Sequence, residues 1–409
     1  TSSHRENLDR WHYISRASDA QFANHLGASD RAEPATVEKE LEDERLAGLQ
    51  ATDLGLLLDE YYRENPGFRR AQLVTWCFDE IQVVPGWERF VRRMLDSERV
   101  EILLSGSSAR MLSREVATAM RGRALETVIT PFSFREFATC RGATLPTGRA
   151  LASAADESSW LARLDEYLAI GGFPEAGRHD LADQRVALLQ GYVDAVLFRD
   201  IAERHRLENL VALRAFVRQL LRQPATALSV NKIHQDFRSR GIAVSKETLL
   251  ALLAHLEDAF LVFTIPIASR SERRQQTNPR KVYLADHGLA AAFQVASAEN
   301  RGRHLENMVA CELQRWCREV AYVRTASGFE VDFLATARDG TEHLVQVAAD
   351  VRDAATFDRE IRALHDAAAA HPRARRILIV DRPLPRGVEV GKGIEVVKLW
   401  RWLLAPSVA

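Results

Sequence analysis

Two acidic residues close a short apolar run early in the chain, and they are the first candidates for chemistry. Leu73 to Phe78 is rich in strand-forming residues and is followed at once by Asp79 and Glu80. A continuous apolar run is typical of a strand buried in a parallel sheet. Ligands of such sheets bind outside the carboxyl ends of the strands, where one carboxylate can hold Mg²⁺ through its water shell and the next can orient an attacking water. We expect Asp79 to be the metal-side acid and Glu80 the base; acids that merely end a strand in solvent are the alternative.

Hydroxyl groups follow the next apolar run. Val100 to Leu104 ends in Ser105-Gly106-Ser107-Ser108, and an amphipathic stretch, Trp87 to Leu95, lies between the two runs. Strand, helix and strand over about thirty residues predict a βαβ unit, whose two strand ends face one crevice. Ser107 or Ser108 would then bond the attacking water or a terminal phosphate oxygen. Either serine would equally well cap the helical pattern that follows.

Two arginines, Arg121 and Arg123, flank a glycine beyond that helical pattern. The planar guanidinium fork binds oxyanions in a bidentate way, which suits the charge that develops on a transferring phosphoryl group. Two ordinary surface arginines are the alternative.

Longer stretches around these residues match a known family. They include FDEIQVVPGWERFVRRMLD, ILLSGSSARMLSREVATAMRGRALETVITPFSFREF, YLAIGGFPEA, KVYLADHGL, HLENMVACEL and FEVDFLA, spread over roughly residues 41–409. In these sequences the chain resembles prokaryotic AAA-type ATPases that carry the C-terminal domain of unknown function 4143. The resemblance implies ATP and Mg²⁺ as ligands, a winged helix after the ATPase core and a nuclease-like C-terminal fold. It assigns the Walker B pair to Asp79 and Glu80, the sensor to Ser107 or Ser108, and an arginine finger to Arg121 or Arg123.

The sequence lacks the phosphate loop that such an ATPase needs. The loop, GxxxxGK[ST], cradles the phosphates with backbone amides, and its lysine neutralises the β/γ charge. The chain has six lysines; Lys39 has no glycine near it, and the one Gly-Lys pair, Gly391-Lys392, is followed by Gly393. A deletion, a frameshift or a misassigned gene start is the simplest account. Without the loop, the acids would repel a triphosphate, so we expect weak or no ATP turnover.

The pattern of residues 213–285 predicts three helices, a strand, a basic loop and a strand. This is the order of a winged helix-turn-helix. The loop, Arg270 to Lys281, has five basic residues against one acid. Basic side chains on a recognition helix and a wing neutralise DNA phosphates. A module that packs against other domains, with a solvated wing, is the alternative. The candidate nucleic-acid contacts are Lys246, Arg273, Arg274 and Lys281.

The C-terminal region has acids in the order of a PD-(D/E)XK nuclease: Glu306, Glu312, Glu330 and Asp332, followed by Gln346. That chemistry needs carboxylates for Mg²⁺ and a lysine that positions water. Here an amide replaces one ligand and Ala348 stands where the lysine is expected. We therefore expect a degenerate nuclease site at Glu312, Asp332 and Gln346. A helix face on which Glu306 and Glu312 pair with Arg303 and Arg315 is the alternative.

The expected fold class is therefore α/β, with a P-loop NTPase-like parallel sheet that is incomplete at its N-terminus, a winged-helix middle domain and a nuclease-like C-terminal domain. The acidic, aperiodic start of the chain is expected to be loosely ordered. The expected boundaries are 1–40 for that segment, 41–140 for the ATPase core, 141–210 for a helical linker, 211–290 for the winged helix and 300–409 for the nuclease-like domain.

Composition restricts the remaining classes. The net charge of −1 excludes a globally basic nucleic-acid coat, and the four cysteines have no metal-ligand spacing. No apolar run is long enough for a membrane span, and a reducing cytoplasm suits the thiols. The function expected is that of an ATP-binding AAA-type protein impaired in its phosphate loop, with a DNA or protein client and a possible homo-oligomer. The alternatives are a non-enzymatic DNA- or protein-binding module and a metal-dependent nuclease.

Overall fold

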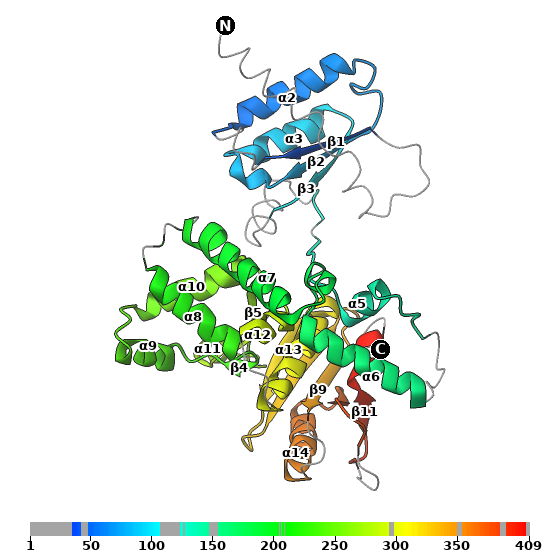
Figure 1. The fold of residues 1–409 in the computed structure, drawn as a ribbon, viewed down its shortest axis with the longest axis vertical. Coiled ribbons are helices and arrows are strands. Elements are labelled where there is room, and N and C mark those ends of the chain that lie inside the picture. Colours follow the sequence, from blue (N-terminus) through cyan, green and yellow to red (C-terminus); the bar gives the residue numbers. More distant parts are fainter. Residues whose placement is uncertain are drawn as a thin grey trace. The chain divides into compact units, whose positions relative to one another are not determined.

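A computed structural model of the chain divides into two compact units, residues 1–128 and 129–409 (Figure 1). The structure describes residues 35–41, 48–106, 123–125, 127–146, 154–203, 205, 207, 209–293, 298–349, 354–384 and 390–405. We describe each unit by itself.

The described part of the N-terminal unit is a three-stranded parallel sheet in the order β1-β2-β3. The strands are β1 (Ala35–Glu40), β2 (Val74–Asp79) and β3 (Val100–Leu104). Helix α3 (Trp87–Ser97) joins β2 to β3, which confirms the predicted βαβ unit, and a single 3-10 turn (Ile81–Val83) precedes it. Helix α2 (Ala51–Glu64) lies between β1 and β2 in the chain.

Strand β1 differs from the expectation that residues 1–40 are irregular. Ala35 pairs with Val74, and the register continues to Glu40 opposite Asp79. The sequence of β1 has no apolar alternation and therefore did not predict a strand. The strand forms there because it pairs with the apolar strand β2. Residues 1–34 lie outside the described part of the chain.

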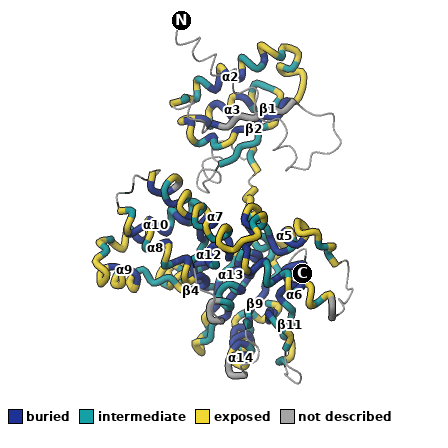
Figure 2. Tube along the Cα trace, in the orientation of Figure 1, coloured by how far each residue is buried: buried dark blue, intermediate teal, exposed yellow. Residues whose placement is uncertain are grey.

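One face of this sheet carries the core of the N-terminal unit. Alternate residues of β2, namely Val74, Trp76 and Phe78, are buried against the apolar stripes of α2 and α3. Side chains two apart in a strand share a face, so the helices pack on that side. The rings of Trp76 and Phe78 stack at 5.7 Å between centroids. Figure 2 shows the resulting buried band along β2. This packing fixes where β2 ends and therefore where Asp79 lies.

The second unit begins with helices, several of which lie in residues 141–210, where a helical linker was expected. They are α5 (Phe134–Cys140), α6 (Ala154–Ile170), α7 (Ala182–Ala195), a π-helical segment (Val196–Glu203) and α8 (Leu210–Arg222), with a 3-10 turn at Ala176–Arg178.

A three-helix and three-strand module continues from α8. Helices α9 (Val230–Ser239) and α10 (Lys246–Asp258) follow it, and the small antiparallel sheet has the order β4-β6-β5. Its strands are β4 (Thr226–Ala227), β5 (Val262–Ile265) and β6 (Lys281–Leu284). The expected basic loop between β5 and β6 is not a loop throughout, because Glu272–Thr277 forms the short helix α11. Its start is capped by the Ser271 hydroxyl, which accepts a hydrogen bond from the Arg274 amide at 3.4 Å.

The remaining residues form a five-stranded sheet in the order β11-β10-β9-β8-β7, preceded by helices α12 (His287–Phe293) and α13 (Ala298–Trp316). The pairs β7-β8 and β8-β9 are antiparallel, whereas β9-β10 and β10-β11 are parallel. The strands are β7 (Cys317–Arg324), β8 (Glu330–Ala337), β9 (Glu342–Ala348), β10 (Arg375–Val380) and β11 (Ile394–Lys398), with helices α14 (Ala354–Ala370) and α15 (Leu399–Leu404).

Helices cover both faces of the five-stranded sheet, as the strand alternation requires. Val345 and Ile377 share one core with α13, while Leu344 and Leu378, one residue away, share another with α14. Because neighbouring side chains of a strand point to opposite faces, the two cores lie on opposite sides of the sheet. No helix in the described part of the chain is long and apolar enough to cross a membrane.

Candidate functional site

Asp79 and Ser105 meet at the carboxyl ends of β2 and β3. The two strands are parallel and Phe78 pairs with Leu104, so the next residue of each strand reaches the same edge. The Ser105 hydroxyl donates a hydrogen bond to Asp79 Oδ1, and the Ser105 amide donates to the Phe78 carbonyl at 3.0 Å. The predicted juxtaposition of an acid and a hydroxyl is therefore present. Its serine is Ser105, two positions before Ser107, and the signal for it was that Ser105 is the first residue after the strand.

Glu80 turns sharply away from the strand beside Asp79. Its backbone is left-handed, with φ of 51°, and its side chain accepts a hydrogen bond from the Gln82 amide group. A left-handed conformation is uncommon for a residue other than glycine and is found where a chain direction must change abruptly. Gly106 lies against the same amide, since a Cβ there would be 2.6 Å from Gln82 Oε1. Gln82, which the sequence analysis did not single out, thus packs between the two strand ends.

The other residues predicted for this edge are not brought to it. Ser107, Ser108 and Arg121 lie outside the described residues. Arg123 is described, and its guanidinium pairs with Asp96 at 2.6 Å near the end of α3. Because α3 ends just before β3 begins, this pair lies toward the amino ends of the strands, opposite the edge that carries Asp79. Arg123 is therefore not an oxyanion ligand of that edge in this structure.

The side chains at the edge are chemically suited to Mg²⁺. Asp79 is exposed and supplies carboxylate oxygens, and Ser105 adds a hydroxyl beside it. Hard cations such as Mg²⁺ prefer oxygen ligands and keep several waters, so an exposed carboxylate at a strand end fits one. The sequence supplies no lysine of a phosphate loop for a triphosphate at this edge.

A lysine surrounded by three carboxylates is buried in the second unit. The Lys281 ammonium, at the start of β6, lies 3.0 Å from Glu306 Oε1, 2.8 Å from Glu330 Oε1 and 3.6 Å from Asp332 Oδ1. The Tyr283 hydroxyl donates to Glu306 Oε1 at 2.8 Å. Only 4% of Lys281 is exposed. The prediction that Lys281 contacts nucleic acid is therefore wrong, because its ammonium is enclosed by these acids.

Burial and mutual repulsion change the pKa values in this cluster. Burial raises the pKa of Glu306 to about 7, and the neighbouring Asp332 adds to the increase. Burial also raises the pKa of Asp332. For Lys281, burial alone would lower the pKa, but the surrounding carboxylates outweigh it and raise the pKa. The ammonium therefore stays charged, while Glu306 and Asp332 take up protons more readily than exposed carboxylates do.

Asp332 also belongs to a polar row along β8 and β9. Its second oxygen accepts from the Val347 amide at 3.0 Å, and its own amide donates to Gln346 Oε1 at 3.1 Å. Gln346 then donates to Glu360 Oε2 at 2.5 Å. The predicted pair Asp332 and Gln346 is thus adjacent. Among the described side chains, no three His, Cys, Asp or Glu residues are arranged to hold a metal ion.

Glu312 is not part of that row, contrary to the predicted degenerate nuclease site. Its carboxylate accepts from the Trp316 indole and lies 3.5 Å from Arg315 Nε, three residues along the same helix. The alternative of a helix-face pair with Arg315 is thus confirmed for Glu312. For Glu306 the partner is Lys281 and not the predicted Arg303. The two acids are six residues apart on α13 and therefore point in different directions.

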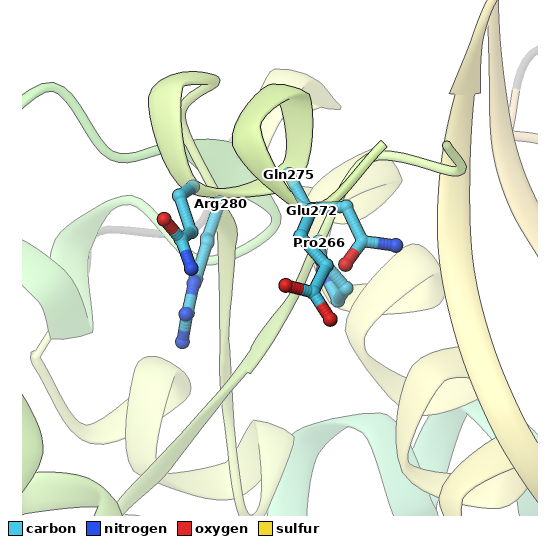
Figure 3. A pocket seen from close by; sticks show the side chains of 5 residues that line it. Pro266, Glu272, Gln275 and Arg280 are labelled. Carbon is cyan, nitrogen blue, oxygen red and sulfur yellow. The ribbon is translucent and has the colours of Figure 1, made fainter. Parts of the chain in front are cut away.

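The remaining predicted nucleic-acid contacts lie on exposed surfaces. Lys246 begins α10, whose first turn is capped by Ser245 Oγ accepting from the Thr248 amide at 3.0 Å. Arg273 and Arg274 are exposed on α11. A pocket of about 400 Å³ lies between α11 and the residues after β5, and Figure 3 shows Glu272 and Arg280 among its walls. This pocket holds both signs of charge.

Two of the sequence stretches that carry the family resemblance meet in the core of the second unit. The buried Asp286 carboxylate accepts hydrogen bonds from the Gly172 amide at 2.7 Å and from the Gly288 amide at 2.9 Å. Gly171 has φ of +86°, and a Cβ there would lie 2.2 Å from Asp286 Oδ1. The glycines of GGFPEA and the acid of YLADHGL are therefore a packing requirement of this unit.

Comparison with known proteins relates both units to existing families. An AAA domain matches residues 20–138, and a Domain of unknown function (DUF8612) matches residues 161–300. The sequence is 30% identical over 373 residues to the uncharacterized protein MJ1544 of Methanocaldococcus jannaschii, covering 89% of this chain and 80% of that protein. An uncharacterized protein of Haemophilus influenzae is 28% identical over 335 residues, with 81% and 78% coverage.

Solved structures show weaker similarity. The Walker-type ATPase PABY2304 of Pyrococcus abyssi has a TM-score of 0.37 at 14% identity, covering 64% of this chain and 84% of that one. The Orc1 protein of Aeropyrum pernix, solved in complex with DNA, has a TM-score of 0.27 at 15% identity, with 64% and 77% coverage.

The parallel sheet, its acidic strand end and the AAA match define the N-terminal unit as AAA-type. The chain belongs to the same family as MJ1544 of M. jannaschii. The matched domain of the second unit, DUF8612, carries a different designation from the domain 4143 expected from the resemblance.

Proposed function

We propose that the chain is an AAA-type nucleotide-binding protein whose affinity for ATP is impaired because no phosphate-loop lysine is present. The observation that supports it is the contact of Ser105 with Asp79 at the carboxyl ends of two parallel strands. In this proposal Asp79 holds Mg²⁺ through water, and Glu80 orients the attacking water.

Turnover of radiolabelled ATP in excess Mg²⁺ tests this proposal with two variants. Glu80→Gln removes the proposed base, and Glu64→Gln removes an exposed acid at the end of α2 as a matched control. We expect turnover of the native chain near background, with any remainder lost in Glu80→Gln and kept in Glu64→Gln. Rapid native turnover would contradict the impairment. Turnover that Glu80→Gln leaves unchanged would contradict the site.

A second candidate function is non-enzymatic binding of DNA through the module from α8 to β6. Three helices and a three-stranded antiparallel sheet follow one another there in the order of a winged helix, and Lys246, Arg273 and Arg274 are exposed on two of its helices. Basic side chains on such a module would neutralise phosphates, so binding would weaken as salt rises. The alternative is that the same module binds a protein client. A titration with DNA distinguishes the two functions.

We also propose that the C-terminal sheet is a nuclease-like fold that has lost its catalytic set. Gln346 stands where one acidic metal ligand is expected, and its side-chain amide is hydrogen-bonded to Asp332 and Glu360. Ala348 stands where the lysine is expected. Cleavage of DNA in Mg²⁺ that is lost on Asp332→Ala would contradict this proposal.

A further inference from the structure

The carboxylate cluster around Lys281 joins two parts of the second unit that are distant in sequence. Lys281 and Tyr283 belong to β6 of the small sheet, whereas Glu306 lies on α13 and Asp332 on β8 of the C-terminal sheet. The ion pairs of Lys281 all link β6 of the small sheet to acids on α13 or β8. The cluster therefore acts between the two sheets and not within either.

Each carboxylate of the cluster already has a second partner besides the ammonium. Glu306 accepts from the Tyr283 hydroxyl, Asp332 accepts from the Val347 amide, and Glu330 pairs with Arg324 at 3.3 Å. Their oxygens converge on an ammonium and on protein donors, so a metal ion would have to displace these contacts. Buried charges are tolerated only when they are paired and hydrogen-bonded in this way.

Neutral hydrogen bonds also link β6 to α13, at the end of β6 away from Lys281. The Asn307 side chain accepts from the Leu284 amide at 2.8 Å and donates to the Leu284 carbonyl at 3.1 Å. The Cys311 thiol also donates to the Leu284 carbonyl, at 3.3 Å. The main chain at the end of β6 is thus held by side chains of α13, while Lys281 lies at the start of β6.

We propose that the Lys281 ammonium is a built-in cation of this cluster, so that the three acids form an ionic joint that holds the β4-β6-β5 sheet to the C-terminal sheet and do not bind a metal. The lysine expected on β9 is absent, and Lys281 from β6 of the other sheet lies beside these acids instead. There it holds the two sheets together. This inference concerns the second unit alone and does not depend on ATP binding.

Stability and thiol reactivity of the full chain test the joint together. Lys281→Met leaves three acids without their cation, and the loss of one partner of a buried ion pair is strongly destabilising. We expect Tm of the second unit to fall by roughly 5–10 °C. Adding Asp332→Asn should recover part of that loss, because one unpaired charge is removed. Lys398→Met, which breaks a single and more exposed pair with Glu157, is the matched control and should change Tm much less.

Alkylation followed by peptide mass spectrometry reads out the docking itself. Loosening of the joint should speed the modification of Cys311, which contacts β6, relative to Cys317 in the same chain. An unchanged Tm and unchanged Cys311 labelling in Lys281→Met would overturn the proposal. If that variant does not fold, Glu330→Gln, at the more exposed rim, should produce the same two effects in milder form; no effect on either would again overturn it.

A titration with Mn²⁺ separates the joint from a metal site. We expect Mn²⁺ to leave Tm of the native chain unchanged. A rise in Tm with Mn²⁺ that disappears in Asp332→Asn would show that the acids bind a metal, and would overturn the proposal.

Discussion

Glu306 and its helix neighbour His304 respond to pH in opposite directions. The raised pKa of Glu306, about 7 against an ordinary 4.5, means that the fold prefers the protonated acid. Its contribution to stability is complete below pH 4.5 and is lost as the pH rises through 7. Burial lowers the pKa of His304 to about 4, aided by the nearby His287 and Arg301. The contribution of His304 is complete above its ordinary value of 6.5 and is lost as the pH falls through 4.

Glu306→Gln isolates the first of these two effects. We predict that the free energy of unfolding of this variant, relative to the native chain, rises between pH 4.5 and 7 by up to about 3 kcal/mol. The reason is that only the native chain has to ionise a buried acid over that range. Urea unfolding at several pH values measures the difference. A difference that does not vary with pH would contradict the raised pKa.

Residue identities explain why part of the site could be predicted and part could not. Asp79 was predictable because an apolar run that stops at an acid marks a strand end. Lys281 was misassigned because its sequence neighbours are Arg280 and the basic stretch before it, whereas its contacts are with acids 25 or more residues away. The charge of the neighbouring residues in the sequence therefore did not predict whether the Lys281 side chain is exposed, because tertiary contacts decide that.

At the scale of elements, apolar periodicity located α3, β2 and β3 to within a few residues. It missed β1, which is an edge strand of the described N-terminal sheet. An edge strand can be polar because only one side of it is paired, so its sequence lacks the apolar run. The helix α11 was also missed, because a polar helix of six residues has no apolar stripe to reveal it.

Capping of α10 gives a prediction at this scale. Ser245→Ala removes the acceptor of the Thr248 amide and should lower the free energy of unfolding by about 1 kcal/mol. Ser245→Asp keeps an acceptor at the same place and should retain most of that stability, with help from the helix dipole. Chemical denaturation of both variants measures this. Equal losses in the two would indicate that the serine acts in some way other than capping.

At the scale of the whole molecule, the near-neutral net charge conceals a separation of charge along the chain. Basic residues gather in and around α8 to α11, while acids dominate the first sixty residues. The βαβ order of β2, α3 and β3 was predictable from the sequence, as were the three helices and two strands expected in residues 213–285, whereas β1, β4 and α11 were not. The docking of the small sheet on the C-terminal sheet was not, because it depends on contacts between residues far apart in the chain.

Salt dependence tests the proposed DNA surface of the molecule. We predict that the double variant Arg273→Ala, Arg274→Ala binds duplex DNA more weakly and reduces the slope of log K against log salt by up to about 2. Arg338→Ala, on an exposed turn of the C-terminal sheet, is the control and should leave the slope unchanged. Gel shifts at several salt concentrations give both quantities. Equal slopes in the native chain and the double variant would exclude α11 from the DNA surface.

Equilibrium binding of ATP in the presence of Mg²⁺ tests the central proposal most directly. In this proposal Asp79, at the end of β2, holds Mg²⁺ beside the Ser105 hydroxyl that follows β3, but no phosphate-loop lysine is present to bind the triphosphate. We predict weak binding that saturates only in the millimolar range and is weakened further by Asp79→Ala. Binding in the micromolar range, or weak binding that Asp79→Ala leaves unchanged, would contradict the account.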